Sequence, residues 1–380
     1  MSAAPDAQRS LGRPQQRPDV LQATLDDEML VYHPDRMTAV ALNPTASVIW
    51  QLCNGERTVA DIVEILRQAY PEAAGTMARE VDEGVLALLS HAVIRLPRDG
   101  ASIATYDVGL AAETVRVEAD DANAARILEF LCAPMTRPTA RDPAVTFRLG
   151  AATTPGAMAI YRDDVMLYHG RSETSVATIF LERILDHLIR TCTNGILLHA
   201  AAVARDGKAL VLAGKTGAGK TTLATWLVRR GFDYLSDELL CLDTQATSVN
   251  GFARPLHLKR PARALFAGAI DMDGGAAVME SPLGVHVSPA RLGARVAHSA
   301  CPRALVLPAY RAGARFHLRS VSKAQAASRL MGCLVNARER PQHGFDDVLS
   351  LVQAAPAFAM TYSGLEEAGA QLETMLRSFD

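Results

Sequence analysis

The sequence predicts a mixed α/β protein whose C-terminal domain is an α/β phosphate-binding fold. A small winged-helix-like domain and a small α+β lobe precede it. Three observations predict this class: short strands followed by amphipathic helices over 19–97, alternating strand patterns over 98–195, and an apolar strand that runs into a glycine-rich loop within 196–380. Residues 1–18 are predicted to be a disordered leader.

The composition of the chain narrows the classes of partner that it could bind. The chain has 380 residues, 49% of them hydrophobic and 21% charged, with a formal net charge of −2. This balance argues against nucleic acid as the main partner. No apolar run approaches the ~18 residues of a membrane span, so no membrane partner is predicted. The six cysteines include no CxxC pair, which predicts reduced thiols and a cytoplasmic location.

Residues 19–97 carry clear boundary signals. Strand patterns over 30–32 and 38–42 are followed by Asn43-Pro44, which suits the start of a helix. Thr58 to Asp61 resembles a capping box at the start of a second helix. A third helix is predicted over 78–91, and a short strand over 93–96 closes the unit.

Two uses of this small domain stay open from its residues. Its helices carry few Lys or Arg, which disfavours DNA binding. An exposed edge strand beside a helix suits an extended peptide that pairs through backbone hydrogen bonds. A purely structural cap is the other possibility. The runs Thr38–Leu52 and Gly55–Ile62 resemble the PqqD family of precursor-peptide recognition domains, and the resemblance implies leader-peptide binding between strand 38–42 and helix 78–91.

The segment 98–195 is less informative. Alternating residues predict short strands, a turn lies at Arg162–Asp164, and apolar spacing predicts two helices. The predicted strands cover 114–117, 145–149, 158–161 and 165–168, and the predicted helices cover 122–131 and 174–192.

The C-terminal domain carries the strongest motif. A strand pattern over 209–213 leads into Gly-Lys-Thr-Gly-Ala-Gly-Lys-Thr at 214–221, a complete Walker A pattern, and a helix pattern follows over 222–230. Glycines let successive backbone N–H groups converge on a phosphate at a helix N-terminus. We predict that Lys220 neutralises the β- and γ-phosphates of ATP and that Thr221 ligates Mg²⁺. The predicted nucleotide-binding residues are Gly214, Thr216, Gly217, Ala218, Gly219, Lys220, Thr221 and Thr222.

Phosphoryl transfer also needs an acidic side chain near the phosphates. Asp237, followed by Glu238, comes after Tyr234-Leu235-Ser236, whereas Asp243 ends the apolar run 239–242. Hydropathy alone favours neither Asp237 nor Asp243.

A second resemblance favours Asp237. Leu198–Val203, the Walker A segment and Leu235–Glu238 occur in the order and approximate spacing of the HPr kinase/phosphorylase family, with His199 lying 21 residues before Lys220 and Asp237 lying 17 after it. The resemblance implies an HPr kinase-like P-loop domain in which His199 and Asp237 serve catalysis together with Lys220, while Glu238 helps to hold metal. It also implies assembly as a homo-oligomer. Glu238 stands where that family has an aspartate, and the family's downstream signature is missing, so HPr itself and phosphorylase activity are not predicted.

Three other C-terminal features carry expectations. Arg254 and Lys259 have the charge to reach γ-phosphate oxygens, with a solvated surface as the alternative. The glycine-rich stretch 267–289 is predicted to be a mobile loop that closes over the acceptor, with disorder as the alternative. Apolar spacing over 365–376 predicts an amphipathic core helix.

Together these features predict an ATP- and Mg²⁺-dependent kinase. Its first domain binds a precursor peptide and its last domain phosphorylates a Ser or Thr hydroxyl on that peptide. Two alternatives remain open: a nucleotide-gated peptide carrier without kinase activity, and ATP-dependent activation of a peptide carboxylate. The sequence does not distinguish ATP from GTP, and it does not name the peptide.

Overall fold

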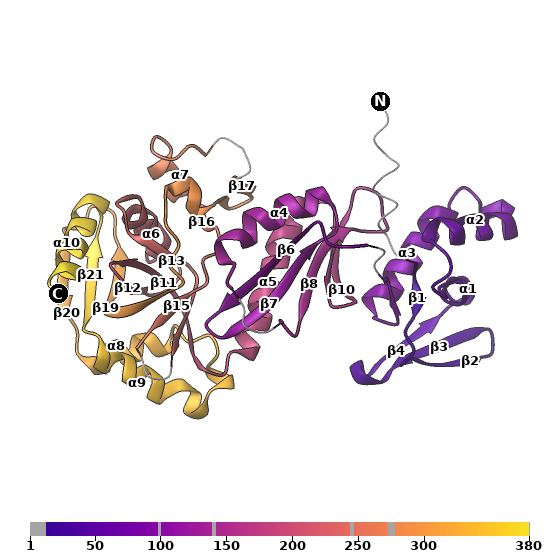
Figure 1. Cartoon of the computed structure of the whole chain (residues 1–380), viewed down its shortest axis with the longest axis horizontal. Coiled ribbons are helices and arrows are strands. Elements are labelled where there is room, and N and C mark those ends of the chain that lie inside the picture. Colours follow the sequence, from indigo (N-terminus) through magenta and orange to yellow (C-terminus); the bar gives the residue numbers. More distant parts are fainter. Residues whose placement is uncertain (1–12, 98–99, 139–141, 244–246, 273–277, 380) are drawn as a thin grey trace. The chain divides into compact units, whose positions relative to one another are not determined.

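The computed structural model of the chain describes residues 13–97, 100–138, 142–243, 247–272 and 278–379 (Figure 1). These residues form two compact units. The first comprises the described residues within Met1–Thr105, Arg116–Leu128 and Ala144–Phe180, and the second comprises those within Tyr106–Val115, Glu129–Pro143 and Leu181–Asp380. The predicted domain boundaries after residues 97 and 195 remain predictions.

The first unit begins with an antiparallel sheet in the order β2-β3-β4, followed by three helices. The strands are β2 (Leu21–Leu25), β3 (Glu28–His33) and β4 (Thr38–Leu42), and the helices are α1 (Pro44–Leu52), α2 (Val59–Ala69) and α3 (Met77–Ser90). The predicted caps are confirmed: the Asn43 side chain accepts a hydrogen bond from the Ala46 N–H, and Thr58 and Asp61 form a capping box. β2 was not predicted, although Leu21, Ala23 and Leu25 alternate with polar residues as in a strand; all five of its residues are exposed.

The N-terminal leader is more ordered than expected. Residues 1–12 of the predicted disordered leader lie outside the described residues. In the remainder, β1 (Gln15–Gln16) pairs with β5 (Ile94–Arg95). The Gln16 N–H donates to the Cys53 carbonyl at 2.9 Å, and the Arg17 N–H donates to the Val93 carbonyl at 3.1 Å. Disorder is therefore the wrong prediction for this part, which is held by backbone hydrogen bonds to distant segments.

The core of the first unit joins the helices to strands that come later in the chain. Trp50, Ile62 and Val81 are buried together with Tyr161 and Met166. Tyr161 and Met166 belong to a sheet in the order β10-β9-β8-β7-β6. Its elements are β6 (Ala104–Leu110), β7 (Glu113–Ala119), α4 (Ala122–Cys132), β8 (Thr146–Ala151), β9 (Met158–Arg162) and β10 (Val165–Gly170), and α5 (Glu173–Thr191) follows.

A mixed sheet organises the second unit. Its strands run in the order β12-β11-β14-β15-β19-β21-β20, β13 pairs with β11, and β12 also pairs in parallel with β19. These strands are β11 (Gly195–Arg205), β12 (Lys208–Ala213), β13 (Asp233–Ser236), β14 (Leu239–Asp243), β15 (Val249–Gly251), β19 (Ser299–Tyr310), β20 (His317–Ser320) and β21 (Ala357–Tyr362).

Helices cover both faces of this sheet (Figure 1). Alternate residues of β11 face opposite sides: Val203 packs with α6 (Lys220–Arg229) and α10 (Leu365–Arg377), and Ala202 packs with α8 (Lys323–Met331) and α9 (Phe345–Ala354). The helix predicted over 365–376 is confirmed by α10, which buries Ala368, Gly369, Leu372 and Leu376. Among the described residues, no helix combines the length and apolarity needed to cross a membrane.

The stretch 267–289 differs from its prediction. Residues 273–277 lie outside the described residues, but β17 (Val278–Ser281) and β18 (Gly284–Val287) form a hairpin. β18 also pairs with β16 (Leu256–Lys259), which leads into α7 (Arg260–Phe266). A wholly mobile or disordered loop is therefore wrong for 278–287. The backbone pairing satisfies this segment's polar groups, which its glycine content does not reveal.

Candidate active site

The glycine-rich loop 214–219 joins buried strand β12 to α6. Gly217 and Gly219 have φ values of 85° and 93°, in the left-handed region that glycine enters most easily. A Cβ at Gly219 would also collide with the hydroxyl of Tyr362, which donates to the Gly219 carbonyl at 3.2 Å. Both the backbone and its neighbour therefore require glycine at 219.

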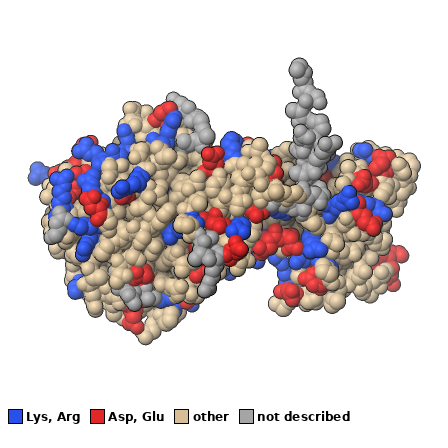
Figure 2. Space-filling model, viewed as in Figure 1, with Lys and Arg blue, Asp and Glu red and all other residues tan. Residues whose placement is uncertain are grey.

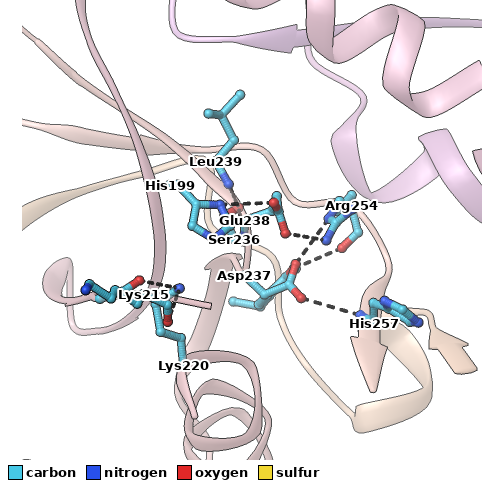
Figure 3. Close-up of polar contacts among 11 residues, drawn as sticks. His199, Lys215, Lys220, Ser236, Asp237, Glu238, Leu239, Arg254 and His257 are labelled. Atoms are coloured by element: carbon cyan, nitrogen blue, oxygen red, sulfur yellow. Dashed lines mark hydrogen bonds and ion pairs between the residues drawn. The ribbon is translucent and has the colours of Figure 1, made fainter. Parts of the chain in front are cut away.

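Lys220 opens α6 and folds back over this loop. Its side chain is largely buried, and Nζ donates to the carbonyls of Gly214 at 2.7 Å and Lys215 at 3.4 Å (Figure 3). Burial lowers the pKa of Lys220, while the charges of Glu238 and Asp237 oppose that shift. The ammonium thus lies within the electrostatic reach of both acids.

The other residues predicted to bind the nucleotide lie on loop 214–219 or in the first turn of α6. Thr216 is exposed, Ala218 is half-buried, and Thr221 and Thr222 are half-buried in the first turn of α6. The N–H groups of this turn have no earlier helical carbonyl to pair with, so the turn favours negative charge.

Asp237 lies in the turn between β13 and β14. Ser236 shapes this turn, because its Oγ accepts from the N–H groups of Glu238 at 3.2 Å and Leu239 at 3.1 Å. Asp237 is only 2% exposed. Three donors hold its carboxylate. The Tyr234 hydroxyl donates at 3.2 Å, and Arg254 Nε and the His257 N–H donate at 3.3 Å and 3.4 Å (Figure 3).

Glu238 is held by two cationic or polar side chains. Its Oε1 lies 3.0 Å from Nδ1 of His199, and its Oε2 accepts from Arg254 Nη2 at 2.7 Å. His199 reaches this position because β11 and β14 pair with His199 opposite Leu239. Burial alone would raise the pKa of Glu238, but the hydrogen bond from His199 and the charges of Arg254 and Lys220 lower it to about 2.

Arg254 bridges the two acids. Burial opposes its charged form, but the carboxylates of Asp237 and Glu238 raise its pKa. The sequence suggested a contact with phosphate or a solvated position for Arg254, and the structure pairs it with the acids instead. Tyr234 and His257 are members of this cluster that sequence reasoning missed. Tyr234 lies three residues before Asp237 on β13, and His257 lies on β16; no motif marks either residue.

Asp243, the other acid considered, lies outside this cluster. It pairs with Gly195 at the opposite end of β14 from Leu239. Its carboxylate accepts hydrogen bonds from Thr247 and Ser248 in the following turn. Lys259 also lies outside it, on the exposed end of β16, where it lines an open cavity of about 380 Å³ with Arg260, Pro261, Pro282 and Leu283.

The depressed pKa of Glu238 predicts an acid-sensitive stability. The carboxylate has an ordinary pKa of 4.5 and a folded value of about 2, so its stabilising effect is complete above about 4.5 and is lost as the pH falls towards 2. We expect Glu238→Gln to make the melting temperature fall less steeply over this range. As a control, Glu280→Gln removes an acid that pairs with Arg263 but is 62% exposed, and it should keep the wild-type slope. An unchanged slope in Glu238→Gln would contradict the assignment.

Comparisons with known proteins bear on both ends of the chain. Residues 28–94 match the family model described as Coenzyme PQQ synthesis protein D (PqqD). A solved structure titled "TbiB1 in Complex with the TbiA(beta) Leader Peptide" is similar at 24% identity and a TM-score of 0.20, covering 21% of this chain and 93% of that one. The HPr(Ser) kinase/phosphatase from Coxiella burnetii is similar at 12% identity and a TM-score of 0.26, covering 48% of this chain and 95% of that one. A comparison with curated protein sequences returned no match. The chain therefore carries a PqqD domain at residues 28–94, as its sequence motif predicted.

Proposed function

We propose that this chain is an ATP-dependent kinase that binds a precursor peptide through its PqqD domain and phosphorylates a Ser or Thr hydroxyl on it. The observation that carries the proposal is the cluster around Asp237 and Glu238. The structure gathers these acids with Arg254 and His199, and their charges act on the buried Lys220 at the glycine-rich loop. Phosphoryl transfer depends mainly on such positioning and charge neutralisation.

The residues present fit a magnesium nucleotide. The open space around Gly217 and the left-handed glycines leave room for phosphate oxygens against the loop. Thr221 supplies a hydroxyl and Glu238 a carboxylate, the oxygen ligands that Mg²⁺ prefers. When bound, Mg-ATP supplies the transferable phosphoryl group and a neutralising cation.

Each residue of the cluster has a separate role in the proposed transfer. Asp237 would orient the acceptor hydroxyl and accept its proton, while the γ-phosphoryl group passes to that oxygen and ADP leaves. Lys220 neutralises the charge on the phosphates. Arg254 holds the carboxylates of Asp237 and Glu238 in place. His199 positions Glu238 through its Nδ1 contact.

The PqqD domain has a free strand edge for the peptide. Among the described residues β4 pairs only with β3, and its residues alternate between half-buried and exposed up to Leu42. An extended peptide can pair with such an edge through backbone hydrogen bonds. Joining this domain to the kinase raises the local concentration of the acceptor at the site. A cytoplasmic location and a homo-oligomeric state remain predictions.

The test uses the full chain with ATP, Mg²⁺ and a precursor peptide encoded by a neighbouring gene. Mass spectrometry should find a phosphate on a Ser or Thr of the peptide, with release of ADP. Release of ADP together with a dehydrated peptide would instead indicate carboxylate activation. Binding of ATP and peptide without ADP release would indicate a nucleotide-gated carrier, and either result would overturn the kinase assignment.

A further inference from the structure

An aromatic pair stands beside the glycine-rich loop, outside the acidic cluster. Tyr310 ends β19 and Tyr362 ends β21, and both strands are linked in parallel to β12, so their carboxyl ends lie at the same edge of the sheet as loop 214–219. The Tyr310 N–H donates to the Ala218 carbonyl at 3.2 Å. The two rings meet edge to face, with centroids 5.7 Å apart and an interplanar angle of 71°.

The two tyrosines differ in the solvent exposure of their side chains. Tyr362 is 1% exposed, and its hydroxyl donates a hydrogen bond to the Gly219 carbonyl. Tyr310 is 49% exposed, although its backbone is tied to the loop and its ring is braced by Tyr362. Tyr310 therefore presents a fixed aromatic surface to solvent. Its backbone is hydrogen-bonded to Ala218, one of the residues predicted to hold phosphate.

The sheet order places this ring at the end of the site away from the acids. Asp237 and Glu238 follow β13, which pairs with β11 on one side of β12. Tyr310 ends β19, which pairs with β12 on its other side. A nucleotide whose terminal phosphate faces Asp237 must extend its sugar and base away from the acids.

We propose that Tyr310 is a specificity residue whose ring forms the stacking platform for the base of the bound nucleotide, a purine. This inference rests on the proposed nucleotide site. Purines offer the larger π-surface for an aromatic contact, and stacking does not depend on hydrogen bonds to the base edge. Tyr310 therefore favours ATP and GTP over pyrimidine triphosphates and discriminates little between the two purines.

The experiment measures calorimetric binding of Mg-ATP and of Mg-tripolyphosphate, which has the phosphates but no base, to the full chain. Base stacking on an aromatic side chain corresponds to about 5- to 150-fold in affinity. We expect Tyr310→Ala to weaken ATP binding within this range and to leave tripolyphosphate binding unchanged. Tyr310→Phe, which keeps the ring, should bind ATP like the wild type. Tyr70→Ala is the matched control, because Tyr70 is 45% exposed and follows α2 in the other unit.

The outcomes separate the two proposals. Equal ATP affinity in Tyr310→Ala and wild type would overturn the stacking role. A parallel loss of ATP and tripolyphosphate binding would also overturn it, because the ring would then be supporting the loop. If the wild type binds neither probe, the nucleotide site itself fails and the stacking role fails with it.

Discussion

Lys220→Ala is expected to lower phosphoryl transfer by about 10²- to 10³-fold, the usual effect of removing one preorganised donor at developing charge. The substitution removes a largely buried ammonium that acts at the start of α6. It also removes the hydrogen bonds to the Gly214 and Lys215 carbonyls that hold the loop in its present form. Initial rates with labelled ATP measure the first effect, and titration calorimetry measures the accompanying loss of nucleotide affinity.

Lys215→Ala is the matched control for this change. Lys215 lies on the same loop, is exposed, and contributes only its backbone carbonyl to Lys220. The control deletes one positive charge from the loop without touching the buried ammonium. Transfer should therefore stay within a few-fold of the wild type. Equal losses in the two variants would show that general loop charge, rather than the Lys220 position, governs binding.

Asp237→Asn is expected to lower transfer by about 10²- to 10⁴-fold, because the amide cannot accept the proton of the acceptor hydroxyl. Nucleotide affinity should change far less, since Asn keeps the size of the side chain and one acceptor oxygen. The Arg254 guanidinium donates to Glu238 at 2.7 Å, and the substitution leaves both of these side chains in place. Single-turnover rates, with binding measured separately, distinguish lost chemistry from lost affinity.

Asp243→Asn is the control that the sequence itself suggests. Asp243→Asn is the same substitution at the end of β14, where the carboxylate accepts hydrogen bonds from Thr247 and Ser248. We expect unchanged transfer and a loss of about 1 kcal/mol in stability, the usual scale of a surface hydrogen bond. The catalytic assignment would be reversed if phosphoryl transfer persisted in Asp237→Asn and was lost in Asp243→Asn. Thermal melts of both variants show whether folding is intact.

Local structure was predicted well wherever neighbouring residues dictate it. Asn43 and Thr58 were predicted to begin helices, and their side chains do cap α1 and α2. The apolar run 209–213 is the buried strand β12, which leads into loop 214–219 and α6. Each of these features depends on contacts within a few residues, so the sequence pattern carries them.

Elements that depend on distant partners were missed. The hairpin β17–β18 lies in a stretch whose glycines suggested mobility, and its pairing with β16 orders it. Gln15 and Gln16 belong to a predicted disordered leader, yet they pair with β5. Backbone hydrogen bonds to remote strands leave no periodic mark in the sequence.

The amino-acid sequence by itself determined the PqqD motif, the helix caps and the glycine-rich loop, because capping and left-handed glycines act over a few residues. Which side chains gather at the site was decided by the tertiary structure alone. His199 meets Glu238 only after β11 and β14, which are distant in the chain, have paired, and Arg254 meets Asp237 across 17 residues of sequence. Asp243 lies just four residues beyond Leu239, yet the direction of β14 carries it to the other end of the strand.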